Sequence, residues 1–183
     1  PHSFDITDYL NEPDAENLLA VKVHKFCDGT WMEDQDMFYD GGIFRDVYLY
    51  SAPLVHIQDY KVETDLDADY RNAELKLEIT VANASTEEAS GCKADVKLYD
   101  AEGNVFADGI VLNLGMIPAA GDTDGKASAT VTTTIISPKL WSAETPYLYT
   151  MVLSLYDSGT SEYLGSVSQQ LGFREIEFTR TEV

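Results

Sequence analysis

The chain of 183 residues has 12 Lys and Arg against 32 Asp and Glu, a formal net charge of -20 at pH 7. This charge repels phosphate backbones and anionic lipid head groups, so we expect neither nucleic acid nor a membrane as a partner. A hydrophobic share of 44% with 11 tyrosines is typical of globular proteins and argues against disorder. The acidic excess fits an acidic substrate channel, a cation site or a solubilising surface.

The two cysteines, Cys27 and Cys92, lie far apart and belong to no Cys-x-x-Cys or Cys/His cluster. The sequence therefore predicts neither a zinc site nor a disulfide framework, and both residues are interpreted as buried thiols. No run approaches the roughly 18 apolar residues of a membrane-spanning helix. The chain opens with Pro-His-Ser-Phe and no initiator Met, so we interpret it as part of something longer.

The first 52 residues predict two strands, at 18–26 and 43–50. In the first, Leu19, Val21 and Val23 alternate with polar neighbours, as a half-buried strand requires. Two or three strands are too few to close a sandwich. This region is therefore predicted to be the end of a domain that begins elsewhere.

Beyond Pro53, short alternating runs separated by turn residues predict an all-β sandwich. About seven strands in some 125 residues are typical of an immunoglobulin-like, antiparallel fold. The strands are predicted near 54–64, 73–83, 92–100, 104–114, 127–136, 147–157 and 162–178. The predicted core consists of Leu75, Leu77, Ile79, Val81, Val96, Leu98, Val152 and Leu155. Trp141, just before the turn at Pro146, is interpreted as a structural plug of that core.

The segment from Asp28 to Phe38 shows no strand alternation and contains the closely spaced carboxylates Glu33, Asp34 and Asp36. Such oxygens could ligate a hard cation, or accept hydrogen bonds from sugar hydroxyls beside an aromatic ring. A solvated acidic loop is the alternative. Catalysis is not predicted, because retaining glycosidases need an acid and a nucleophile roughly 5–5.5 Å apart on rigid supports, and neighbours on one loop do not guarantee this.

Six sequence motifs resemble those of the β-galactosidases of glycoside hydrolase family 2 and occur in the same order, and together they cover nearly the whole chain. The loop Glu-Asp-Gln-Asp followed by Gly-Ile-Phe-Arg-Asp-Val resembles the galactosidase branch more than the glucuronidase branch. The motifs that carry the resemblance are 4–10, 17–23, 33–38, 42–47, 140–149 and 171–176.

The resemblance implies that residues 1–52 end a sugar-binding jelly-roll domain and that 53–178 form the immunoglobulin-like sandwich. Residues 179–183 would begin a linker to a catalytic barrel, which holds both catalytic glutamates of the family. We therefore expect this chain to be inactive by itself, whereas its parent would hydrolyse terminal β-galactosides, in the cytoplasm of a bacterium. The barrel, the rest of the jelly roll and the galactoside are the expected partners, with a homo-oligomeric parent as an open option.

One binding residue follows from the resemblance. The second Asp of the family's Glu-Asp-Gln-Asp loop contacts the galactosyl group and, in some members, a sodium ion, and Asp36 holds that position here. Asp36 is therefore predicted to bind both substrate and metal. The other sodium ligands come from the barrel, so no cofactor is expected in this chain alone, and sodium or magnesium only in the parent. A free-standing carbohydrate-binding or adhesion module is the alternative that composition leaves open.

Overall fold

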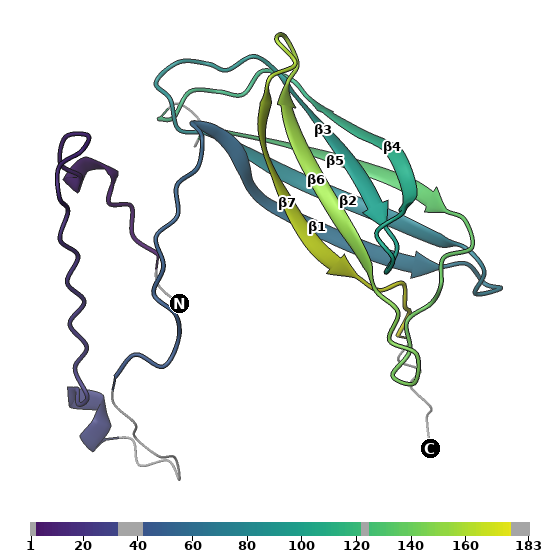
Figure 1. Ribbon diagram of the computed structural model, residues 1–183, viewed down its shortest axis with the longest axis horizontal. Coiled ribbons are helices and arrows are strands. Elements are labelled where there is room, and N and C mark those ends of the chain that lie inside the picture. Colours follow the sequence, from purple (N-terminus) through teal and green to yellow (C-terminus); the bar gives the residue numbers. More distant parts are fainter. Residues whose placement is uncertain (1–2, 33–41, 122–124, 177–183) are drawn as a thin grey trace. The chain divides into compact units, whose positions relative to one another are not determined.

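The computed structural model describes residues 3–32, 42–121 and 125–176, and the chain divides into two compact units (Figure 1). The N-terminal unit, Pro1–Tyr50, has two short 3-10 helices, η1 (Thr7–Tyr9) and η2 (Asp28–Trp31). The sandwich unit, Ser51–Val183, contains the strands. These are β1 (Val55–Leu66), β2 (Ala73–Asn83), β3 (Cys92–Tyr99), β4 (Val105–Leu114), β5 (Lys126–Ile135), β6 (Tyr149–Asp157) and β7 (Tyr163–Leu171).

The strands of the sandwich unit form two antiparallel sheets. One sheet has the order β1-β2-β5 and the other β4-β3-β6-β7, so the chain crosses between the sheets as in an immunoglobulin-like fold (Figure 1). Every predicted strand beyond Pro53 is present, which confirms the all-β prediction. The last is shorter than predicted because the ladder with β6 ends at Leu171, after which Phe173 forms an isolated bridge with Leu140.

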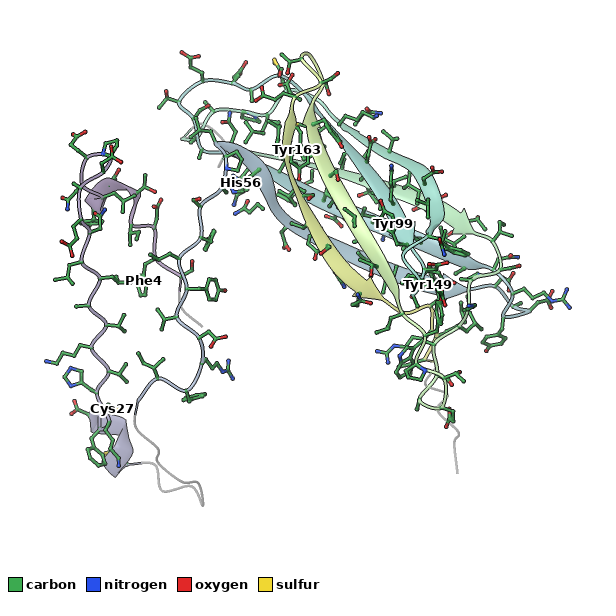
Figure 2. All side chains as sticks on the ribbon, in the orientation of Figure 1. Phe4, Cys27, His56, Tyr99, Tyr149 and Tyr163 are labelled. Carbon is green, nitrogen blue, oxygen red and sulfur yellow. The ribbon has the colours of Figure 1, made fainter. Side chains whose placement is uncertain are left out.

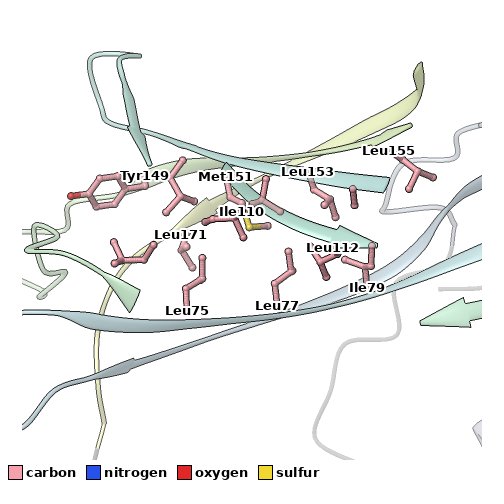
Figure 3. Packing of buried hydrophobic residues seen from close by; sticks show 14 of the residues in the cluster. Leu75, Leu77, Ile79, Ile110, Leu112, Tyr149, Met151, Leu153, Leu155 and Leu171 are labelled. Carbon is pink, nitrogen blue, oxygen red and sulfur yellow. The ribbon is translucent and has the colours of Figure 1, made fainter. Parts of the chain in front are cut away.

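Side chains of alternate strand residues fill the space between the sheets. In β2, Leu75, Leu77, Ile79 and Val81 are each at most 1% exposed, whereas Glu74 and the other charged residues of the strand face solvent. Met151, Leu153 and Leu155 of β6 are also fully buried in this cluster, and Figure 3 shows them across the core from β2. The period of two therefore determines which face of each strand enters the core.

One predicted core residue is wrong for the same reason. Val152 and Leu155 were both assigned to the core, but they lie three positions apart on β6 and so point to opposite faces of the sheet. Leu155 is buried, while Val152 is only half-buried on the outer face. The inward positions on either side of Val152 belong to Met151 and Leu153.

A buried asparagine, Asn83, forms hydrogen bonds to the loops at the end of β2. The Asn83 amide nitrogen donates to the backbone oxygens of Glu87 (2.8 Å) and Pro118 (3.1 Å), while its Oδ1 accepts from the Ser85 N–H at 2.9 Å. The Asn83 backbone N–H donates to the Gly125 oxygen at 2.7 Å. Gly125 has φ +60°, and a Cβ there would lie 2.5 Å from the Asn83 oxygen, so this close approach requires glycine.

The β6–β7 turn is organised by the Asp157 carboxylate. Its Oδ1 accepts from the backbone N–H groups of Gly159 (2.8 Å) and Thr160 (2.7 Å), and its Oδ2 accepts from the Ser90 hydroxyl. These hydrogen bonds, that of Ser90 first, stabilise the charged form and lower the pKa of Asp157 to about 2.

This pKa shift predicts an acid-sensitive turn. Because the folded pKa is depressed, the carboxylate stabilises the fold fully above about pH 4 and loses that contribution as the pH falls towards about 2. We expect Asp157→Asn to unfold more easily than the wild type at neutral pH, with the difference shrinking over that window. Urea denaturation at several pH values measures the difference in the free energy of unfolding between the variant and the wild type. The exposed Asp108→Asn is the control, and a difference that stays constant with pH would contradict the prediction.

The N-terminal unit departs from the predicted strands at 18–26 and 43–50. Both segments are described, yet neither is a strand. Backbone hydrogen bonds such as those from Tyr9 to Ile6 and from Leu10 to Thr7 join positions three apart, and Leu19, Val21 and Val23 are 50–55% exposed. Alternation supplies the apolar face of a strand, but a strand also needs a hydrogen-bonded neighbour, and the described residues of this unit pair neither segment.

The cysteines differ from each other. Cys92 is buried in β3, and burial raises the pKa of its thiol. Cys27 is exposed in the N-terminal unit, so its interpretation as a buried thiol is wrong.

In the described part of the chain, no helix is long and apolar enough to cross a membrane.

Candidate functional site

The acidic loop singled out in the sequence is described only at its two ends. Residues 28–31 form η2, and the Met32 N–H donates to the Gly29 oxygen at 3.0 Å. The chain is described again from Gly42, whose φ of +117° suits glycine. Asp36 lies outside the described residues, as do Glu33, Asp34, Phe38 and the side chain of Trp31. The roles of Asp36 in substrate and metal binding therefore stay predictions.

Metal binding has no independent support from the rest of the chain. Within residues 3–32, 42–121 and 125–176, no three His, Cys, Asp or Glu side chains are grouped so that they could hold an ion.

The sandwich unit has a hollow of about 480 Å³ on the side where edge strands β1 and β7 face solvent. It is called the β1–β7 hollow below. Residues of both strands, of the segment before β6 and of the segment after β7 line it. They are Val62, Thr64, Trp141, Leu148, Gln169, Gln170, Leu171, Gly172, Arg174 and Ile176.

Trp141 and Arg174 contact each other in this hollow. The backbone N–H of Trp141 donates to the backbone oxygen of Phe173 at 2.8 Å, which holds residues 140–141 beside the chain after β7. The Arg174 guanidinium carbon lies 4.9 Å from the centre of a Trp141 ring, within cation–π distance. A Cβ at Gly172 would come 3.0 Å from the Trp141 Cβ, which is a tight contact, so the small size of glycine helps the indole to pack this closely.

Trp141 is therefore not the core plug predicted from the sequence. It is half-buried and lines the hollow, because Phe173 and Tyr149 already fill the adjacent end of the core. Their rings pack edge to face with centroids 5.3 Å apart, and the Tyr149 hydroxyl accepts from the Lys139 N–H at 2.8 Å. Figure 2 shows Tyr149 at this end of the sandwich.

Sequence reasoning missed the hollow, although a signal was present. Two of the family-like motifs, 140–149 and 171–176, are remote in sequence but meet here through the Leu140–Phe173 bridge. Both motifs contribute lining residues, namely Trp141 and Leu148 from the first and Leu171, Gly172, Arg174 and Ile176 from the second.

The chemistry of the β1–β7 hollow is that of a binding surface. Its lining combines apolar side chains with the amides of Gln169 and Gln170 and the Arg174 guanidinium, and the described lining residues include no carboxylate. Glycoside hydrolysis needs a carboxylic acid and a second carboxylate. The described lining residues supply neither group. Fold and site together define an all-β accessory region.

Comparisons with known proteins identify its family. Residues 1–53 match the family model "Glycosyl hydrolases family 2, sugar binding domain", and residues 55–174 match the model "Glycosyl hydrolases family 2". The chain belongs to glycosyl hydrolases family 2.

Curated relatives share most of this chain's length. A β-galactosidase of Priestia megaterium is 40% identical over 178 residues, covering 97% of this chain and 16% of the relative. A β-galactosidase of Vibrio cholerae is 38% identical over 182 residues, covering 98% of this chain and 17% of the relative. The chain thus spans about a sixth of the length of these relatives.

Solved structures show the same fold. A Bacteroides uniformis β-glucuronidase matches with a TM-score of 0.68 and 24% identity, covering 79% of this chain and 17% of that structure. A putative β-galactosidase of Bacteroides fragilis matches with a TM-score of 0.57 and 20% identity, over 69% of this chain and 19% of that structure. At such identities the likeness concerns the fold alone.

Proposed function

We propose that this chain is a non-catalytic portion of a β-galactosidase that hydrolyses terminal β-galactosides. The observation that carries the proposal is the identity of 38–40% to proteins named β-galactosidase over 97–98% of this chain. The β-glucuronidase structure is less similar, at 24% identity over 79% of the chain. Galactosides are thus favoured over glucuronides.

In this proposal, residues 1–52 complete a sugar-binding jelly roll, and residues 53–178 are a sandwich that positions neighbouring domains. Asp36 contacts the galactosyl group, since an ionised carboxylate can accept from a sugar hydroxyl and ligate a hard cation together. Sodium, or magnesium, would act in the longer enzyme, where other groups complete its ligands. The bacterial cytoplasm, expected from the sequence, stays a prediction for that enzyme.

The longer enzyme tests the function directly. The full-length protein should be expressed from its coding sequence in a host without β-galactosidase and assayed with chromogenic β-galactoside and β-glucuronide. We expect kcat/KM to be higher for the galactoside. Preference for the glucuronide, or activity on neither, would overturn the proposed function.

The 183-residue chain by itself is expected to give no turnover of a chromogenic β-galactoside. A lone loop carboxylate supplies neither the acid nor the nucleophile, and the described lining of the β1–β7 hollow has no carboxylate at all. The measurement is product release by chain purified from the same host, with the full-length enzyme as the positive control. Turnover that co-purifies with the chain through several steps would contradict the prediction.

A further inference from the structure

An Asp-Gly pair, Asp108 and Gly109, lies in strand β4. Among the described strands, β4 is hydrogen-bonded only to β3, so it forms one edge of its sheet (Figure 1). Both residues of the pair are exposed to solvent. The sequence has four Asp-Gly pairs, at 28–29, 40–41, 108–109 and 124–125, and the pair at 108–109 lies within a described strand.

The ladder between β3 and β4 is irregular at this pair. Its register shifts between the partners Val96–Ile110 and Leu98–Ala107, so that Lys97 of β3 faces both residues of the Asp-Gly pair. Two residues opposite one make a β-bulge, in which the extra residue is left unpaired and the ladder is locally disrupted. The main chain is therefore held less firmly here than in a regular strand.

The surroundings leave both reacting groups accessible. Gly109 has φ +71°, and a Cβ built on it would meet no atom within 4 Å. The ion pairs among the described residues do not include the Asp108 carboxylate. By contrast, the carboxylates of Asp100 and Asp157 accept hydrogen bonds from backbone N–H groups in their turns.

An aspartyl side chain followed by glycine can react with its own main chain. The glycine nitrogen attacks the carbon of the protonated side-chain carboxyl group, Cγ, which closes a five-membered succinimide ring and releases one water. Water then opens the ring. Attack at Cγ restores aspartate, whereas attack at the main-chain carbonyl carbon breaks its bond to the glycine nitrogen and leaves the chain linked through Cγ, as an isoaspartyl residue. The water released in the first step is consumed in the second, so the isomerisation needs no other reactant.

Ring closure depends on the backbone around the pair. The main chain must rotate until the glycine nitrogen lies within bonding distance of Cγ, and a regular ladder opposes this rotation because it must open locally first. A β-bulge removes part of that resistance, and glycine has no Cβ to obstruct the ring.

We propose that Asp108 is a site of spontaneous isoaspartyl modification in the folded chain. The β-bulge makes it more reactive than an Asp-Gly pair at regular, exposed positions of another edge strand. This modification goes beyond the proposed function and does not depend on it, because it involves neither the sugar nor the residues expected to bind it.

The double variant Ser168→Asp/Gln169→Gly tests the role of the bulge within one molecule. It creates a second Asp-Gly pair on β7, also an edge strand, at two exposed positions where the ladder with β6 is regular. The folded variant is incubated at neutral pH and physiological temperature. Electron-transfer fragmentation of its tryptic peptides then locates isoaspartyl residues, which have the same mass as aspartyl residues. We expect isoaspartate to form at Asp108 at least about tenfold faster than at position 168. A smaller difference would overturn the proposal.

The same variant unfolded in urea is the control for the chemistry of the neighbouring residues. Without a ladder, the two Asp-Gly pairs should react at similar rates. If Asp108 stayed as far ahead in urea as in the folded chain, its local sequence and not the bulge would determine the reactivity, and the proposal would fail.

The wild-type chain gives a measurement that does not require the variant to fold. Far-UV circular dichroism and the urea transition establish that the strands are intact during the incubation. We expect the rate at Asp108 in the folded chain to lie within about tenfold of its rate in urea, because little opening is needed at the bulge. A folded-state rate that is lower than this would show that the ladder protects Asp108, and would overturn the proposal.

Discussion

Truncating Leu77 to alanine is expected to lower the free energy of unfolding of the chain by about 2–5 kcal/mol. Leu77 is 0% exposed at the middle of β2, and its ladder neighbours are Val62 on β1 and Val131 on β5. Figure 3 shows its side chain pointing into the core between the two sheets. Removing three carbon atoms there loses transfer free energy and leaves a cavity that strands paired on both sides cannot readily close.

Urea denaturation followed by far-UV circular dichroism measures this effect, and the slope against urea should stay unchanged if only stability is altered. Glu78→Ala is the matched control, because it truncates the next residue of the same strand on the solvent face. Its cost should stay within about 0.5 kcal/mol. A similarly small cost for Leu77→Ala would show that the alternation of β2 does not define the core.

The sandwich was predictable because the sequence of its strands alternates between apolar and polar residues and turn residues separate them. Alternation in β2 gives the strand, its inward face and its bounds of 73–83, and paired neighbours in the same chain then satisfy its backbone. Turn residues add the connections. Asp100, for example, accepts from the N–H groups of Glu102 (3.0 Å) and Asn104 (2.7 Å), as its place in an Asp-Ala-Glu-Gly turn indicates.

The N-terminal unit shows where such evidence stops. In residues 18–26, Leu19, Val21 and Val23 alternate as a half-buried strand requires, yet the segment is not a strand. The local sequence pattern therefore predicts which face a strand would bury. Whether the strand forms depends on a neighbouring strand that pairs with its backbone, and the pattern does not identify that neighbour.

Tertiary contacts explain the other differences. Trp141 looked like a core residue because large aromatic side chains usually are, but Phe173 and Tyr149 already occupy that space. The β1–β7 hollow escapes a reading of local pattern because it depends on the bridge between Leu140 and Phe173, which are far apart in sequence. For the candidate site itself, the prediction of Asp36 comes from the resemblance, whereas residue chemistry alone favours a solvated acidic loop.

Asp36→Asn in the full-length enzyme is expected to lower kcat/KM for a β-galactoside by about 10- to 150-fold. This corresponds to losing about 1.5–3 kcal/mol, the contribution typical of a hydrogen bond to a charged group. The change keeps the size of the side chain but removes its negative charge, so a sugar hydroxyl loses a strong acceptor and a cation loses a ligand. Asp34→Asn is the matched control in the same loop and should keep near-wild-type activity.

Measuring the melting temperature of both variants separates binding from folding. We expect Asp36→Asn to melt close to the wild type, because a residue that acts on substrate need not stabilise the fold. Titrating sodium chloride against potassium chloride at constant ionic strength adds a second readout, since a lost cation ligand should weaken any dependence of activity on sodium. Equal, near-wild-type activity in both variants would leave Asp36 as part of a solvated acidic loop, and a collapse in melting temperature for Asp36→Asn alone would make it a structural residue.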